Sequence, residues 1–140
     1  MDDGGWREAP TKDLERAVLA ACRDAGVTEG EVSLALVDDA AIAELNRLHL
    51  GRDGPTDVIA FALYEEGEPL VGDVYVGADQ AARQAAEEGV SLREELVRLA
   101  IHGTLHVLGL EHPEDPGART ASAMYRKQEA LVREVLGLSF

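Results

Sequence analysis

The stretch SLREELVRLAIHGTLHVLGLEH, residues 91–112, contains the features that decide the fold. Ser91 followed three residues later by Glu94 is typical of a helix N-terminus, where each residue's side chain satisfies the other's backbone N–H. Gly109 suits the left-handed turn that ends a helix, so we predict a helix over residues 92–108. Apolar side chains fall on both sides of this helix at ~100° per residue, which predicts a central and largely buried element.

Two histidines lie on this helix, where buried polar side chains need polar partners. His102 and His106 are four residues apart, so their imidazoles lie one turn apart on one face and can bind the same ion. Gly109 lets the chain turn back and brings His112 to a third ligand position. Three protein ligands leave a fourth position for water, as in catalytic zinc sites, so we predict one bound zinc ion per chain. The glycine and third histidine disfavour the alternative of surface histidines without a metal.

The spacing H-x-x-x-H-x-x-G-x-x-H is that of metzincin peptidases, apart from one position. Those enzymes have a glutamate directly after the first histidine as general base. Gly103 stands there in this chain and cannot accept a proton, so hydrolysis of peptides by that route is not supported. Gly103 shares a helix face with Leu96 and Leu99, so we predict that it lets the helix pack closely against its neighbour.

The rest of the chain alternates between helical and strand patterns. We expect a helix from Thr11 to a stop at Gly26, strands across 32–36, 57–63 and 71–76, a short helix capped at 38–39 that runs through Ile42 and Leu45, a loop over 51–55, a helix over 78–88, and a C-terminal helix opened by Asp115-Pro116. These patterns predict one α+β domain over residues 1–140, with a small mixed β-sheet packed with helices and the histidine helix at its centre.

The composition is that of an acidic globular protein. Lys and Arg number 13 against 27 Asp and Glu, a net charge of −14, so binding of RNA would require a local patch, the metal or a docking partner. No apolar run approaches the ~20 residues of a membrane span, and the N-terminus lacks a secretory signal, so we expect a cytoplasmic protein without a membrane partner. Cys22 is the only cysteine, and its apolar helix position predicts a small buried hydrophobe rather than a reactive thiol.

Four ordered blocks match the pattern of one known family. They are His102-Gly103-x-Leu105-His106-x-Leu108-Gly109-x-x-His112; Leu45-Asn46, Asp53, Pro55-Thr56-Asp57-Val58 and Phe61; Gly72-Asp73; and Met124 with Glu129. In this order and spacing the chain resembles the YbeY endoribonucleases, also called rRNA maturation factors. The family's histidine motif usually has Tyr-Asp before its last histidine, where this chain has Leu110-Glu111.

The resemblance implies a zincin-like α+β domain in which a metal-bound water attacks single-stranded RNA. It also implies a role in maturing the 3′ end of small-subunit rRNA and in ribosome quality control, with the small ribosomal subunit or its associated proteins as partners. Two alternatives stay open. One is a non-catalytic ribosome-assembly factor that contains zinc, and the other is a zinc peptidase, against which Gly103 argues.

One position departs from the family pattern. The family usually has an arginine five residues after the leucine of the Leu45-Asn46 pair, and this chain has Leu50 there. We predict that Arg52, two residues along an extended loop, replaces it in catalysis by contacting the RNA backbone; the alternative is a solvated loop charge. Glu111 is the second predicted catalytic residue, as an acid, a base or a partner of a ligating histidine, with an exposed loop acid as the alternative.

Overall fold

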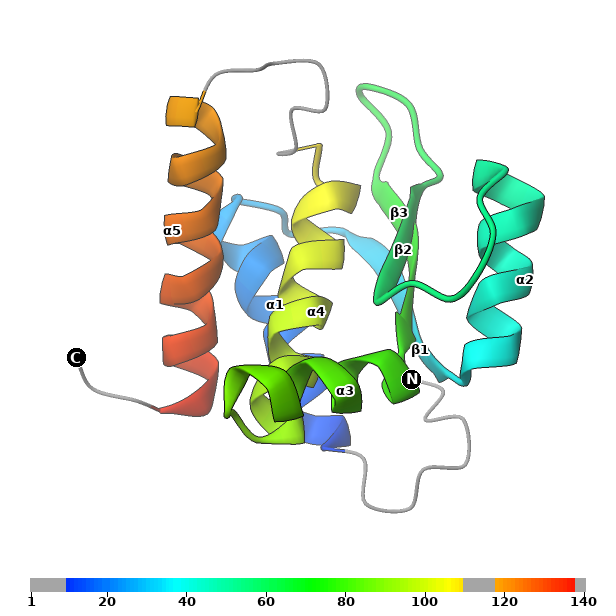
Figure 1. Ribbon diagram of the computed structural model, residues 1–140. Helices are drawn as coiled ribbons and strands as arrows, with labels where there is room; N and C mark the ends of the chain where they lie inside the picture. Colours follow the sequence, from blue (N-terminus) through cyan, green and yellow to red (C-terminus); the bar gives the residue numbers. More distant parts are fainter. Residues whose placement is uncertain (1–9, 110–117, 138–140) are drawn as a thin grey trace.

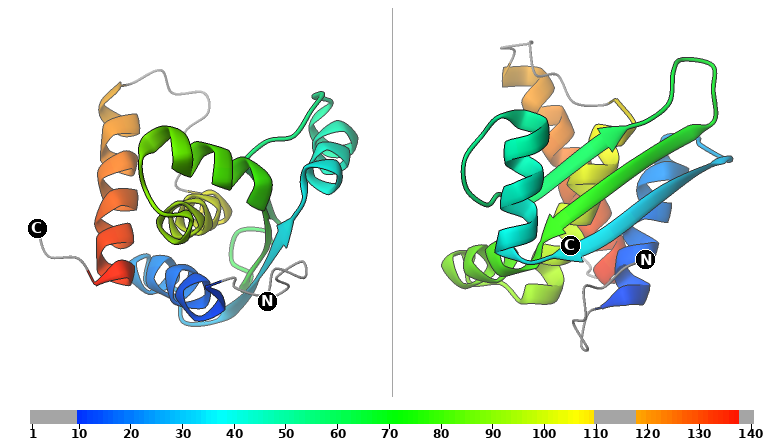
Figure 2. Two further views of the ribbon diagram at one scale, coloured as in Figure 1. Left: turned by 60° about the horizontal axis from the view of Figure 1, so that its bottom comes forward. Right: turned by 90° about the vertical axis from the view of Figure 1, so that its right-hand side faces the viewer.

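The computed structural model describes residues 10–109 and 118–137, and these form an α+β arrangement (Figure 1). Within them the chain forms five helices and three strands, in the order α1 (Thr11–Asp24), β1 (Gly30–Val37), α2 (Asp39–Leu50), β2 (Val58–Ala62), β3 (Leu70–Gly77), α3 (Ala78–Glu88), α4 (Leu92–Val107) and α5 (Ala118–Leu136). Helix α4 packs on one face of the sheet and α2 lies on the other (Figure 2). The predicted combination of a small sheet with packed helices is confirmed.

The strands form a mixed sheet in the order β1-β3-β2. β1 pairs in parallel with β3, with Gly30 opposite Leu70, and β2 pairs with β3 in the antiparallel direction, with Val58 opposite Val76. Successive strand residues point to opposite faces, so Val74 and Val76 of β3 are both buried on the side of α4. The predicted mixed sheet is therefore confirmed, and its central strand is β3.

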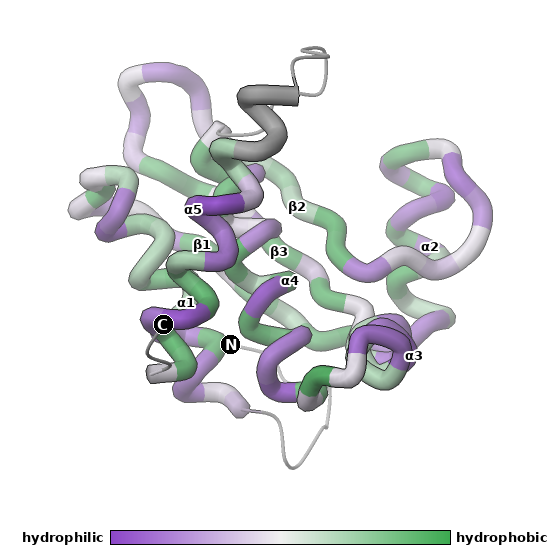
Figure 3. The backbone as a smooth tube through the Cα atoms, turned by 60° about the vertical axis from the view of Figure 1, so that its left-hand side comes forward, coloured by the Kyte–Doolittle hydropathy of each residue, from purple (hydrophilic) through white to green (hydrophobic). Residues whose placement is uncertain are grey.

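Helix α4 is the centre of the hydrophobic core, in contact with α1, α3, α5, β2 and β3 (Figure 2). Ten of its 16 residues are buried, which confirms the predicted central position. The hydroxyl of the fully buried Thr104 donates a 2.7 Å hydrogen bond to the carbonyl oxygen of Ala100, so this polar group is satisfied within the helix. On α5, hydrophobic and hydrophilic residues alternate (Figure 3), as expected for a helix with one face on the core.

The two ends of α4 follow the sequence prediction in part. Ser91 Oγ accepts a 3.0 Å hydrogen bond from the backbone N–H of Glu94, which is the predicted N-terminal cap. The Glu94 carboxylate turns to Arg98, whose Nη2 donates to it over 2.9 Å, so the side chain serves an ion pair. At the other end Gly109 has a φ of 78°, the left-handed conformation expected of it.

Helix α2 is longer than the sequence prediction. It continues beyond Leu45 to Leu50, and Gly51 ends it with a φ of 65°. Residues 46–50, which lie between the predicted helix and the predicted loop, therefore belong to the helix. The predicted opening of the C-terminal helix at Asp115-Pro116 lies outside the described residues; the described helix begins at Ala118.

Two further expectations concern Cys22 and the membrane. Cys22 is half-buried against the core, and its burial raises the pKa of the thiol above its ordinary value. This agrees with a small apolar residue rather than a reactive thiolate, although its burial is only partial. None of the helices in the described part of the chain is both long enough and apolar enough to cross a membrane.

Candidate metal centre

Gly103 brings α4 close to the sheet. A Cβ atom at this position would lie 2.5 Å from Cγ1 of Val74 on β3 and 3.1 Å from Cγ2 of Val58 on β2. These separations are shorter than van der Waals contact, so a larger residue would push the helix away from the strands. This close approach confirms the predicted packing role of Gly103, and it sets the histidine-bearing half of α4 against β2.

His102 and His106 both line a cavity of about 560 Å³ at this end of α4. The side chain of His102 is half-buried and that of His106 is exposed. Partial desolvation lowers the pKa of His106, and the charge of the nearby His102 lowers it further. Both effects favour the neutral imidazole, which is the form that binds a metal ion.

The loop that follows α2 also lines this cavity. The cavity is lined by residues from the end of α2 and that loop, from β2 and from α4: Leu50, Arg52, Asp57, Val58, Ile59, Ala60, His102, Gly103, His106 and Gly109. Arg52, which is far from the histidines in sequence, therefore lies with them at one site. Leu50 lines the same cavity with 49% of its surface exposed, so it occupies the edge of the site without closing it.

A larger cavity of about 850 Å³ lies between α1 and the strands β1 and β3. Its charged lining residues, Glu15, Glu31 and Asp73, are all acidic. An acidic lining repels phosphate groups, and this cavity shares no lining residue with the site of His102 and His106. The smaller cavity is therefore the one whose chemistry matches the histidine motif.

Asn46 holds the loop that carries Arg52. Its side chain is 5% exposed, and its Nδ2 donates a 3.0 Å hydrogen bond to the carbonyl oxygen of Gly54. The backbone carbonyl oxygen of Asn46 accepts a 3.3 Å hydrogen bond from the backbone N–H of Arg52. The sequence shows Asn46 only as part of a family block, whereas the structure assigns it the task of tying the loop to the helix.

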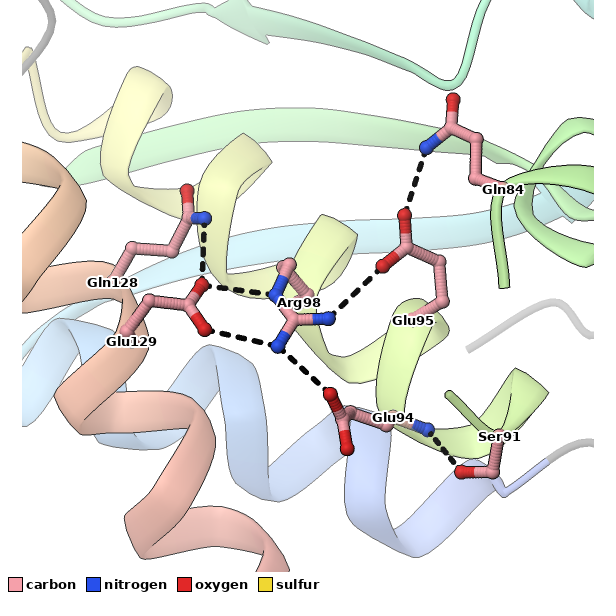
Figure 4. A network of polar contacts seen from close by, with 7 residues as sticks. All are labelled: Gln84, Ser91, Glu94, Glu95, Arg98, Gln128 and Glu129. Atoms are coloured by element: carbon pink, nitrogen blue, oxygen red, sulfur yellow. Dashed lines mark hydrogen bonds and ion pairs between the residues drawn. The ribbon is translucent and has the colours of Figure 1, made fainter. Parts of the chain in front are cut away.

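A side chain from α5 contacts the face of α4 that carries the histidines. Nδ1 of His102 lies 2.7 Å from Oε1 of Gln128, and Nε2 of Gln128 donates a 3.1 Å hydrogen bond to Oε2 of Glu129. The sequence does not identify Gln128 as a site residue, because Gln128 and His102 are far apart in the chain and no spacing rule connects them. Figure 4 shows Gln128 and Glu129 on α5 facing Arg98 on α4.

Arg98 joins these residues to a half-buried ionic network (Figure 4). Its guanidinium donates to both carboxylate oxygens of Glu129 at 2.9 Å, to Glu94 at 2.9 Å and to Glu95 at 3.0 Å. Glu95 is itself buried and accepts a 2.7 Å hydrogen bond from Gln84 of α3. The hydrogen bond from Arg98 lowers the pKa of Glu129, so this carboxylate is ionised at neutral pH. The network fixes α3, α4 and α5 relative to one another.

Two predicted site residues, His112 and Glu111, lie outside the described residues. Among residues 10–109 and 118–137, no group of three or more His, Cys, Asp or Glu side chains is arranged to hold a metal ion. His102 and His106 provide two imidazole nitrogens one helical turn apart, and zinc prefers such donors. The donor set therefore fits a zinc ion if a third ligand comes from residues 110–117, where the sequence has His112.

The fold and site define a small α+β protein with paired histidines on its central helix. Comparison with known proteins gives a family match, Endoribonuclease YbeY, over residues 6–136. A relative of that name from Moorella thermoacetica is 48% identical over 134 residues, which cover 87% of this chain and 84% of the relative. One from Desulfitobacterium hafniense is 40% identical and covers 95% and 96%, respectively. The chain belongs to the YbeY endoribonuclease family.

A solved structure has a similar fold. The solution structure of a Thermotoga maritima protein matches with a TM-score of 0.68 and 29% sequence identity. The match covers 97% of this chain and 87% of that protein. The arrangement of helices around a small sheet is therefore found in an experimentally determined structure of a related sequence.

Proposed function

We propose that this chain is a zinc-dependent endoribonuclease that cleaves single-stranded RNA and matures the 3′ end of small-subunit rRNA. Membership of the YbeY family supports the reaction class, because the relatives named above are endoribonucleases. The observation that carries the proposal is one cavity lined by His102, His106 and Arg52. Paired metal-binding nitrogens beside a cation suit the hydrolysis of an anionic phosphodiester.

The proposed zinc ligands are His102, His106 and His112. A zinc ion held by them would act as a Lewis acid and lower the pKa of a bound water toward ~7. The chain's own part is to hold the two described imidazoles one turn apart, on a helix that close packing at Gly103 keeps against the sheet. The spacing is zincin-like, but Gly103 replaces the glutamate that peptidases use as a base.

Arg52 is the proposed contact to the RNA backbone. Most lysines and arginines of the described residues pair with a carboxylate, namely Arg16, Arg23, Arg47, Arg83, Arg93, Arg98 and Lys127. Arg52 makes no such ion pair with any residue of the described part, so its guanidinium is available to a phosphate in the cavity. A guanidinium matches a phosphate through two parallel charge-assisted hydrogen bonds, which Leu50 cannot make.

The acidic surface shapes how the substrate is reached. With a net charge of −14, long-range attraction of free RNA is weak, and a single cation in the cavity adds only a local contact. Binding to the small ribosomal subunit or to its basic proteins would supply the missing attraction. We therefore place the proposed role at the ribosome, in rRNA maturation and ribosome quality control in the cytoplasm.

The reaction class is tested with single-stranded RNA and a denatured protein as parallel substrates. Zinc-loaded protein is expected to cleave the RNA, to lose this activity with a chelator, to regain it with zinc, and to leave the protein intact. Chelator-sensitive proteolysis without RNA cleavage would instead identify a peptidase. One zinc per chain with neither activity would favour the non-catalytic assembly factor. Leu50 at the family's arginine position also supports that alternative hypothesis.

Arg52→Ala is expected to slow RNA cleavage by roughly 10- to 100-fold, because a hydrogen bond to a charged group contributes about 1.5–3 kcal/mol. Zinc content and the unfolding midpoint should stay at wild-type values, since Arg52 is exposed and its backbone bond to Asn46 survives the change. Cleavage is followed with a labelled single-stranded RNA, and metal content is measured on the same preparations.

Lys12→Ala is the matched control for charge. Lys12 is an exposed cation in the first turn of α1 and lines neither cavity described here. It should cleave like the wild type. Equal cleavage by Arg52→Ala and the wild type would end the idea that Arg52 replaces the family's arginine. Leu50→Arg restores that arginine and should maintain or raise cleavage; activity that appears only in this variant would favour the assembly factor.

A further inference from the structure

We infer that Gln128 is a positioning residue that holds His102 as the Nδ1–H tautomer and so leaves Nε2 with the lone pair that a metal ion needs. The inference deepens the proposed function, because the metal is the proposed zinc. The contacts that carry it come from α5, the C-terminal helix, on which the sequence analysis predicts no site residue. They form a series of hydrogen bonds that runs from Arg98 through Glu129 to Gln128 (Figure 4). The series ends at His102, whose Nδ1 lies 2.7 Å from Oε1 of Gln128.

The series of hydrogen bonds starts at Arg98, a side chain whose protonation state is known. An arginine side chain is a donor only, because it keeps its proton at all ordinary pH values. Nε and Nη2 of Arg98 each donate to one oxygen of Glu129, both over 2.9 Å. A carboxylate paired in this bidentate way is ionised, and an ionised carboxylate can only accept hydrogen bonds. Glu129 therefore presents an acceptor to its next neighbour.

The Glu129 carboxylate, which can only accept hydrogen bonds, determines the orientation of the Gln128 amide. The amide group places its Nε2 3.1 Å from Oε2 of Glu129. The reverse orientation would place the amide oxygen against the carboxylate and lose a hydrogen bond to an ion. Oε1 of Gln128 must then face His102, where it lies 2.7 Å from Nδ1.

The tautomer of His102 is the last step. An amide oxygen offers only lone pairs, so Nδ1 of His102 must carry the hydrogen that forms the 2.7 Å contact. In a neutral imidazole the other nitrogen, Nε2, is then unprotonated and able to bind a metal. Ligating histidines usually donate their second ring N–H to a carboxylate, a carbonyl or water, and the Gln128 amide oxygen meets that need here.

A purely structural role for Gln128 is the competing explanation, since the contact also joins α4 to α5. The two explanations differ in what they require of the imidazole. If the contact only joins the two helices, either tautomer of His102 can form it, because the Gln128 amide can rotate to present its oxygen or its nitrogen. A positioning role requires the Nδ1–H tautomer before any metal is present. The state of the His102 ring in metal-free protein therefore separates them.

The first measurement is nitrogen NMR of wild-type protein with isotopically labelled histidine, freed of metal and held at pH about 8.5, above the ordinary histidine pKa. The expected result is a His102 ring protonated at Nδ1. A His102 ring protonated at Nε2 overturns the inference. This readout does not depend on zinc binding or on cleavage, so it fails or succeeds separately from the proposed function.

The second measurement uses Gln128→Met, which keeps the side-chain length and replaces the amide group with a thioether, a much weaker acceptor. The Nδ1–H form of His102 should cease to predominate, and the dissociation constant for zinc should rise about 10- to 100-fold, the range known for outer-shell partners of metal ligands. Gln84→Met is the matched control, because Gln84 joins the same network at Glu95 on the far side of Arg98 (Figure 4). It should keep both the tautomer and the zinc affinity.

The outcomes are distinguishable. A folded Gln128→Met protein that keeps the Nδ1–H ring and binds zinc within about twofold of wild type overturns the inference. Equal losses in Gln128→Met and Gln84→Met also overturn it, because they would reflect the network's structural role alone. If wild type has the Nδ1–H ring but binds no zinc, the positioning of His102 is supported and the proposed zinc site fails.

Discussion

Replacing His106 with alanine is expected to reduce zinc from about one ion per chain to nearly none, and RNA cleavage by at least about 100-fold. Loss of an outer-shell partner alone costs a metal site about 10- to 100-fold, so loss of a ligand should cost more. The remaining imidazole of His102, with His112, leaves too few protein ligands for a catalytic zinc site. The fold should survive, because the His106 side chain is exposed and outside the buried core.

The matched control is His49→Ala, which removes the fourth histidine of the chain. His49 lies on α2 and packs edge-on against Phe61, with ring centroids 5.0 Å apart. Zinc content and cleavage should remain at wild-type values in this variant. Metal analysis, a cleavage assay and circular dichroism on the same samples separate loss of metal from loss of fold. Full zinc content in a His102→Ala, His106→Ala double variant would contradict the proposed ligand set.

The central helix is predictable from local signals. The cap at Ser91, apolar residues on both sides and the glycine at position 109 agree with one another, and each acts within a few residues of the chain. The spacing of His102 and His106 then follows from helical geometry alone. Such features need no knowledge of tertiary structure, so the sequence is sufficient to predict them.

The extent of α2 depends on a local signal that the sequence prediction did not use. Gly51 lies in the loop, as predicted, and a glycine in the left-handed conformation is also the usual residue at which a helix ends. A helix that continues to this glycine reaches Leu50, so the predicted loop with Arg52 begins directly at the end of α2. That placement is what brings Arg52 to the cavity.

The contacts between distant elements could not be predicted from one sequence. Gln128 reaches His102 only because α5 packs against α4, and Asn46 binds Gly54 only because the loop folds back on α2. Neither pair has a fixed spacing or a compositional signature. Amide side chains are also common on exposed surfaces, so their burial and direction become known only from the packed structure.

Gly103→Glu creates the metzincin sequence in this chain, and we expect it to destroy the fold rather than confer peptidase activity. A Cβ atom would already lie 2.5 Å from Val74 Cγ1, and overpacking of this kind costs about 1–3 kcal/mol. The rest of the glutamate would place a carboxylate in the buried layer between α4 and β3, at a further cost of several kcal/mol. Together these costs approach the ~5–15 kcal/mol stability of a typical domain.

Gly103→Ala tests the same contact with a smaller change. Alanine favours a helix over glycine by about 1 kcal/mol, so a net loss of stability would show that the clash with the sheet outweighs helix propensity. Subtracting this gain from the overpacking cost of about 1–3 kcal/mol, we expect a net loss of up to about 2 kcal/mol in denaturant unfolding. Adding Val74→Ala should relieve the clash, so the double variant should be more stable than the sum of the two single changes predicts. A stable Gly103→Glu protein that digests a denatured protein substrate in a chelator-sensitive reaction would show instead that the helix can withdraw from the sheet and that the peptidase reading is correct.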